Sequence, residues 1–289
     1  MTSTILLDDT VHELQARLAE RSCPAPDVLF LMGTGVDLFG ERLRDPMEIE
    51  LGEFEETPQP WRTCELQAGR LGPLSVWLLD DLGSEDGGLE LDAPWQWGLP
   101  IWLAAAAGAS VLVHTSAGCA LASPESGEPL APVGGFGFLR DHINLSGTNP
   151  LIGLSSSHLG PLFPDLSELH HIGLRRSALG RAEKLGLNCA EVVGACTPGP
   201  AIETAAERVL YAHAGAEVAV QSLATPLLAA AHAGLAMLSI VALTDAATGP
   251  TELQKLVASA SSFQPALQDL LASLTEDLAS AVNALSEGD

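Results

Sequence analysis

Short apolar runs alternate with longer segments of helical periodicity along most of this chain. The apolar runs are typical of strands buried on both faces and cover residues 27–33, 74–80, 109–118, 190–196, 216–222 and 235–244. The helical patterns lie between them and mostly close on glycine, at residues 95–108, 167–186, 203–215 and 225–234. This order predicts an α/β fold with a mainly parallel sheet, whose loops gather at the carboxyl ends of the strands.

The C-terminal stretch, residues 251–286, has helical leucine spacing and is expected to pack outside the sheet. No break in composition divides the 289 residues, of which 47% are hydrophobic. A chain of this size and composition can bury a large core. We therefore predict one domain over residues 1–289.

Charge and targeting signals exclude several classes of partner. The net charge is −24 with only 13 Lys and Arg residues, so nucleic acid and anionic membranes would be repelled over most of the surface. The sequence contains no apolar run of about 18 residues and no leader-like N-terminus. Its five cysteines are odd in number and form no CxxC pair, which is typical of reduced thiols. These features predict a cytoplasmic protein without nucleic-acid or membrane partners.

Four predicted strands end in glycine or small hydroxyl residues: "MGTGVD" (32–37), "HTSAGC" (114–119), "QSLATP" (221–226) and "LTDAATG" (243–249). Each segment offers backbone N–H groups and a hydroxyl at the edge of the sheet where loops gather. Such groups suit a small polar or anionic ligand. Each motif alone is weak evidence, because Gly-Thr-Gly is more often a tight turn.

Residues 80–92 read "DDLGSEDGGLELD" and combine six acidic side chains with three glycines. A metal loop, a solvated linker and a rebuilt active-site loop all fit this composition. The stretch lacks the residue order of a calcium loop, although a divalent ion bridging its carboxylates to phosphate stays an alternative. Adjacent residues on a helix face different directions, so His170 and His171 do not suggest a metal site either. We predict no bound metal.

Three longer motifs bring a family into view: "LRDHINLSGTNPLIG" (139–153), "LFPDLSELH" (162–170) and "CTPGPAIETAAERVLYAHAGAEVAVQSLATPLLAAAHAGL" (196–235). In this order and spacing they resemble the trimeric purine nucleoside phosphorylase family, over roughly residues 27–250. The resemblance implies an α/β domain with a mixed, partly barrel-like sheet flanked by helices. It also implies a homotrimer with active sites near subunit boundaries. The implied reaction is phosphorolysis of purine (deoxy)ribonucleosides, with inorganic phosphate as co-substrate and no cofactor.

The resemblance assigns base-binding and ribose-binding positions. Glu203 stands where the family's glutamate accepts the N1–H of a 6-oxopurine, although a helix N-terminus alone also favours an acidic residue. Asp245 replaces an asparagine that contacts the base at O6 and N7, and an ionised carboxylate accepts but cannot donate. Glu203 therefore indicates a 6-oxopurine, whereas Asp245 resembles members that handle 6-aminopurines unless its carboxyl group is protonated. Gln221 replaces a methionine under the ribose, and Ile202 replaces an aromatic wall.

The implied phosphate site keeps its neutral donors but loses its cation. Thr34, Ser116 and Ser222 match hydroxyl or backbone donors of the family, and Ser116 also lies near the substrate side. Asp81, Gly83 and Glu85 stand where the family carries an arginine and a histidine on phosphate and a tyrosine near the ribose. A charge pair at about 4 Å is worth on the order of 4 kcal/mol at an effective dielectric of about 20. Replacing the arginine by Asp81 therefore weakens phosphate binding unless another cation enters.

Three functions follow from these residues. The first is a purine nucleoside phosphorylase-type glycosyltransferase, in which Glu203 and Asp245 act on the base. The second is a homologue that binds purine or nucleoside without phosphorolysis. The third is a nucleoside hydrolase, in which water replaces phosphate and Asp81 or Glu85 acts as the base.

Overall fold

The computed structural model describes residues 6–33, 39–82, 93–154, 157–246 and 253–287. All six predicted strands form within two residues of their expected limits: β1 (Val28–Met32), β4 (Leu74–Asp80), β5 (Val111–Ala120), β7 (Cys189–Thr197), β8 (Val218–Gln221) and β9 (Ala236–Ala246). Three further strands were not predicted: β2 (Arg44–Glu50), β3 (Glu65–Leu71) and β6 (Phe136–Asn144). The first four residues of the DHINL motif form the end of β6.

The nine strands form one sheet in the order β2-β3-β4-β1-β5-β8-β7-β6-β9. Strand β9 also pairs with β5, so the five strands from β5 to β9 close into a barrel while β2, β3, β4 and β1 extend from it. The pairings of β1 with β4 and β5 are parallel, whereas β5–β8 and β6–β9 are antiparallel. The expectation of a mainly parallel sheet is therefore too simple. The mixed, partly barrel-like sheet implied by the resemblance is confirmed.

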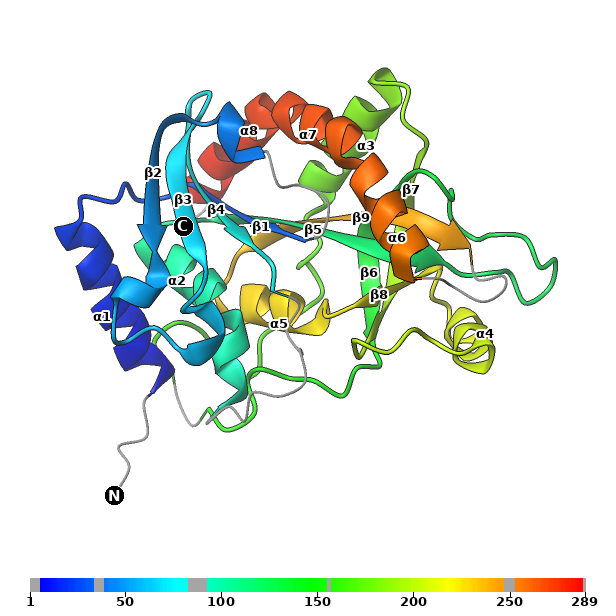
Figure 1. The fold of residues 1–289 in the computed structure, drawn as a ribbon, viewed down its shortest axis with the longest axis horizontal. Helices are drawn as coiled ribbons and strands as arrows, with labels where there is room; N and C mark the ends of the chain where they lie inside the picture. Colours follow the sequence, from blue (N-terminus) through cyan, green and yellow to red (C-terminus); the bar gives the residue numbers. More distant parts are fainter. Residues whose placement is uncertain (1–5, 34–38, 83–92, 155–156, 247–252, 288–289) are drawn as a thin grey trace.

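Helices cover both faces of the sheet (Figure 1). One face carries α1 (Leu7–Glu20), α2 (Leu99–Ala107) and α5 (Ala224–His232), and the other carries α3 (Ile172–Lys184), α7 (Gln264–Ser273) and α8 (Thr275–Ser286). Strand β1 is apolar along its whole length because both of its faces are buried. Leu29 and Leu31 pack into one core and Phe30 into the other, so every side chain of β1 is buried.

The four predicted helices form. Helices α2, α3 and α4 start later than their patterns suggested, whereas α5 starts one residue earlier. Helix α3 begins at Ile172 because the His171 ring accepts a hydrogen bond from the Leu174 N–H and caps it. Helix α4 (Ala205–His213) begins after Thr204, which forms a capping box with Glu207. A 3₁₀ helix, η4 (Pro94–Gly98), precedes α2. The C-terminal stretch forms α6 (Leu253–Ser262), α7 and α8, as predicted.

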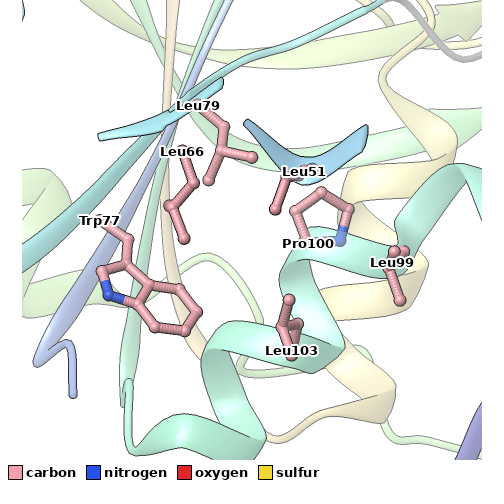
Figure 2. A pocket seen from close by; sticks show the side chains of 7 residues that line it. All are labelled: Leu51, Leu66, Trp77, Leu79, Leu99, Pro100 and Leu103. Atoms are coloured by element: carbon pink, nitrogen blue, oxygen red, sulfur yellow. The ribbon is translucent and has the colours of Figure 1, made fainter. Parts of the chain in front are cut away.

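Three short 3₁₀ helices, η1 (Phe39–Arg42), η2 (Leu51–Glu53) and η3 (Gln59–Trp61), connect the strands at the β2 side of the sheet. Figure 2 shows a pocket in this region, lined by Leu51, Leu66, Trp77, Leu79, Leu99, Pro100 and Leu103. All seven side chains are apolar, so the pocket offers no polar group to orient a ligand. We interpret it as a packing gap in the core.

Among the described helices, none has the length and apolar character needed to cross a membrane. The extent of a single domain over residues 1–289 stays a prediction.

Candidate functional site

Glu203 lies in the loop between β7 and α4, one residue before the Thr204 cap. Its Oε1 atom accepts a hydrogen bond from Thr197 Oγ1 at 2.8 Å and a longer one from Gln221 Nε2 at 3.4 Å. Gln221, at the end of β8, also donates to the Ala201 carbonyl at 2.8 Å. Only 8% of the Glu203 side chain is exposed. Two neighbouring strands therefore hold this buried carboxylate in place.

Arg208 joins Glu203 to Asp245. Its side chain, 6% exposed, extends from the first half of α4, and Nη2 lies 3.9 Å from Glu203 Oε2 and 4.0 Å from Asp245 Oδ2. Thr244 Oγ1 donates to Asp245 Oδ1 at 3.3 Å. Burial raises the pKa of Asp245, and the Arg208 charge opposes this shift. The ends of β7 and β9 thus meet at two carboxylates and one guanidinium, with a net charge of −1.

A thiol and an apolar side chain complete this part of the site. Cys119 pairs with Asp245 in the β5–β9 register. Burial raises the pKa of the Cys119 thiol to about 12, and the Asp245 charge adds to the shift. The thiol is therefore protonated at neutral pH. Ile202 is 38% exposed beside Glu203, so it can offer an apolar surface to a ligand.

Ser222 follows β8 and adopts a left-handed backbone with φ of 58°. This conformation is uncommon for residues other than glycine and costs about 1 kcal/mol or more, so it is typical of functional sites. The Ser222 N–H donates to the Thr197 carbonyl at 3.3 Å, which fixes the turn. A Cβ atom placed on Gly199 would lie 3.5 Å from Ser222 Oγ. Ser222 therefore lies next to the loop that carries Glu203, just before the N-terminus of α5.

Ser116 lies on β5 directly after Thr115, which pairs with Met32 at the end of β1. The Gly33 N–H donates to the Thr115 carbonyl at 2.8 Å, and a Cβ atom at Gly33 would lie 2.4 Å from that oxygen. Only glycine allows this approach. The Ser116 hydroxyl is buried without a hydrogen-bond partner in the described structure. An unsatisfied buried hydroxyl is costly and is a candidate ligand contact.

Asp81 pairs with His114 across the end of β1. His114 Nε2 lies 2.8 Å from Asp81 Oδ2, and the two side chains are 1% and 12% exposed. The Asp81 N–H donates to the Met32 carbonyl at 2.6 Å, which fixes the residue after β4. The carboxylate therefore lies against a buried imidazole at the edge of the sheet that carries Ser116.

The structure thus brings together some of the site residues predicted from the sequence. Glu203, Gln221 and Asp245 form one connected group, Ser222 adjoins it, and Asp81 lies at the β4–β1–β5 edge. Thr34, Gly83 and Glu85 lie outside the described residues. Their predicted roles, and those of the other site residues, stay predictions.

The paired histidines play structural parts in the described chain. His142 Nδ1 lies 3.1 Å from His170 Nε2, and His171 caps α3. Burial, and then the neighbouring His142, lower the pKa of His170 to about 4. Within the described ranges, no group of three or more His, Cys, Asp or Glu side chains is arranged to hold a metal ion.

Residues 99–279, more than half of the chain, match the phosphorylase superfamily. The chain belongs to this superfamily. Purine nucleoside phosphorylase 1 of Geobacillus stearothermophilus is 28% identical over 84% of this chain and 87% of its own. A purine nucleoside phosphorylase of Cellulomonas is 33% identical over 60% of this chain and 57% of its own. The resemblance to purine nucleoside phosphorylases inferred from the sequence is confirmed.

Solved structures agree with this superfamily fold. A Schistosoma purine nucleoside phosphorylase in complex with hypoxanthine matches with a TM-score of 0.84 and 22% identity, over 93% of this chain and 96% of that one. A Schistosoma mansoni purine nucleoside phosphorylase in complex with inosine matches with a TM-score of 0.83 and 21% identity, over 95% and 98% of the two chains. At this identity the match shows the fold.

Sequence reasoning about this superfamily member missed Arg208 and His114. Arg208 falls on the buried face of α4 with Tyr211 and Ala212, at the i, i+3, i+4 spacing of a core-facing helix. A charged residue on that face was the available signal. His114 directly follows the apolar residues at the start of β5, and its position on a buried strand likewise marks a polar group in need of a partner.

Proposed function

We propose that this chain is a purine nucleoside phosphorylase-type glycosyltransferase. It transfers the pentosyl group of purine (deoxy)ribonucleosides to inorganic phosphate, and releases the free base and (deoxy)ribose 1-phosphate. The observation that carries the proposal is the connected group of Glu203, Gln221, Arg208 and Asp245 at the ends of β7, β8 and β9. Membership of the phosphorylase superfamily and the names of the relatives support it.

In this proposal each side chain has a distinct part. Glu203 and Asp245 hold the base, and Gln221 and Ile202 border the ribose. Ser222 and Ser116, with Thr34, hold phosphate below the anomeric carbon, so the attacking oxygen is already in position. The left-handed Ser222 lies before the positive end of the α5 dipole, which favours an anion there. No cofactor other than the co-substrate phosphate is required.

One observation favours a second candidate function. Asp81, instead of a cation, lies at the proposed phosphate side and pairs with His114. An anion at this position opposes a second anion. The chain would then bind purine or nucleoside without phosphorolysis, or would pass the pentosyl group to a water molecule activated by Asp81.

Three measurements on the purified full-length chain separate these functions. We expect base release from inosine, guanosine or adenosine that depends on added phosphate and yields the sugar 1-phosphate. Release that is independent of phosphate would support hydrolysis, and nucleoside binding without turnover would support the binding-only homologue. A chain that neither cleaves nor binds these nucleosides at millimolar concentration would contradict the assignment of the base site.

A further inference from the structure

Arg208 is a buried cation that keeps unused donor capacity. Its Nη2 atom lies near Glu203 Oε2 and Asp245 Oδ2, at 3.9 and 4.0 Å. Both distances exceed the limit of a hydrogen bond. Its Nε atom is buried and has no acceptor among the described residues. Because buried guanidinium groups are normally satisfied, this arrangement indicates that a ligand supplies the missing acceptor.

The two carboxylates direct one oxygen each toward this cation. The hydrogen bonds from Thr197 and Gln221 both reach Oε1 of Glu203, and Thr244 donates to Oδ1 of Asp245. The second oxygens, Oε2 and Oδ2, are the atoms close to Arg208. The site therefore presents a row of acceptor, donor and acceptor, in the order Glu203, Arg208, Asp245.

We propose that Arg208 determines base specificity by acting as the central donor of this row. Carboxylates only accept and guanidinium only donates, so the row fits an edge that reads donor, acceptor, donor. The N1–H, C6=O and N7–H groups of a 6-oxopurine in its N7–H form make such an edge. The inference rests on the proposed function, because that function makes this pocket the base site.

Adenine differs at two of these three positions. In the same N7–H form its N1 atom is an acceptor and its 6-amino group is a donor, so each of these two groups would meet a protein group of the same kind. Sites built to pair with one set of hydrogen-bonding groups reject analogues that leave their buried groups unpaired. Glu203 and Asp245 indicate different bases, and Arg208 shifts the preference of the site to 6-oxopurines. An ionised Asp245 cannot donate a hydrogen bond to the base, so Arg208 supplies the donor.

Calorimetric binding of hypoxanthine and adenine to the full-length chain, without phosphate, tests this inference. We expect the wild type to bind hypoxanthine about tenfold or more tightly than adenine. Arg208→Gln should lose about tenfold in hypoxanthine affinity and little in adenine affinity, so the preference collapses. The matched control is Arg140→Gln, because Arg140 pairs with Glu217 at 3.0 Å on the barrel surface and should leave both affinities unchanged.

Equal or tighter adenine binding by the wild type would overturn the inference, as would undiminished hypoxanthine binding by Arg208→Gln. Failure of both bases to bind at millimolar concentration would overturn it too. If circular dichroism shows that Arg208→Gln is unfolded, Arg208→Lys replaces it. That variant keeps a central cation and should keep the preference for hypoxanthine over adenine. If Arg208→Lys folds normally but binds the two bases equally well, the result contradicts the donor role.

The outcomes for this inference and for the proposed function are separable. An Arg208-dependent preference for hypoxanthine without phosphate-dependent turnover leaves the inference standing and removes phosphorolysis. Phosphate-dependent cleavage that favours adenosine, or that Arg208→Gln leaves unchanged for inosine, keeps the proposed function and removes the inference.

Discussion

Asp81 sets the charge that an anion meets at the β4–β1–β5 edge of the sheet. Its carboxylate pairs with His114 at 2.8 Å, and its side chain is only 12% exposed. Poor solvent screening makes the repulsion of phosphate strong at this position, because the effective dielectric falls with burial. We expect Asp81→Asn to lower the dissociation constant of inorganic phosphate by about tenfold, equivalent to about 1.4 kcal/mol. Calorimetric titration with phosphate measures this.

The neighbouring Asp80 provides the control for this change. Asp80 lies at the exposed end of β4, so Asp80→Asn removes the same charge where water screens it. The control should shift the phosphate dissociation constant by less than twofold. Equal effects of the two substitutions would show that the overall charge of the chain, and not the placement of Asp81, governs anion binding.

His170 should make the fold sensitive to acid. Burial, and then the neighbouring His142, lower the pKa of His170 from 6.5 to about 4. In the unfolded chain His170 takes up a proton near pH 6.5, whereas in the folded chain it stays neutral until about pH 4. Acidification between these values therefore favours unfolding, by about 3 kcal/mol in total for this residue. This contribution is absent above pH 6.5.

Urea unfolding at a series of pH values between 7 and 4 tests this assignment. The loss of unfolding free energy over this range should be smaller in His170→Gln than in the wild type. His12→Gln, on the exposed face of α1, serves as the control and should keep the wild-type slope. Identical pH slopes for His170→Gln and the wild type would refute the assignment, whatever the stability at pH 7.

At the scale of elements, what the sequence could predict depended on burial. Strands β1 and β5 are buried on both faces, so their apolar runs predicted them directly. Strand β2 was missed because it is an edge strand whose residues are mostly exposed and charged. Strand β6 begins buried but ends in polar, more exposed residues, so no apolar run marks its full length.

The candidate site, like the strands, could be predicted only in part from the sequence. The motifs assigned Glu203, Gln221 and Asp245 to one site, and in the structure Gln221 contacts Glu203, which Arg208 links to Asp245. The pairs Arg208 with Asp245 and Asp81 with His114 were not foreseen. Each joins elements that are far apart in the sequence, and only the closure of the barrel and the path of β1 bring them together.

Barrel closure is tight at Gly118, where β5 contacts both β8 and β9. A Cβ atom at this position would lie 2.7 Å from Val241 Cγ1 and 2.8 Å from the Ala219 carbonyl oxygen. The oxygen belongs to the backbone of β8 and cannot move without disturbing the strand. We expect Gly118→Ala to lower the free energy of unfolding by about 1–3 kcal/mol, which urea denaturation measures.

Gly180 on α3 is the matched control, because a Cβ atom there meets nothing within 4 Å. Gly180→Ala should raise the free energy of unfolding by up to about 1 kcal/mol, since alanine is the better helix former. A Gly118→Ala variant as stable as the wild type would mean that β5, β8 and β9 are held less closely than the structure shows.

At the scale of the whole molecule, apolar side chains are exposed along one segment. Phe163 is 93% exposed and Ile152 is 60% exposed, and Leu145, Leu162 and Leu166 are each exposed by more than a third. Large exposed apolar groups gathered in one region are typical of protein interfaces. The segment lies between β6 and α3, and β6 pairs with β7 and β9. It is thus a candidate for the interface of the homotrimer that the sequence resemblance implies.

We expect a mass near 90 kDa in sedimentation experiments, three times that of the 30.0 kDa chain. Ile152→Asp combined with Phe163→Asp should shift the protein toward monomer, because each substitution places a charge where apolar surface would be buried. Leu185→Asp, at the end of α3, changes a similarly exposed leucine outside the segment and should leave the trimer intact. If the double variant stays trimeric, the interface lies elsewhere on the surface. Because the net charge of −24 makes copies repel each other, dissociation of the variant should be most complete at low ionic strength.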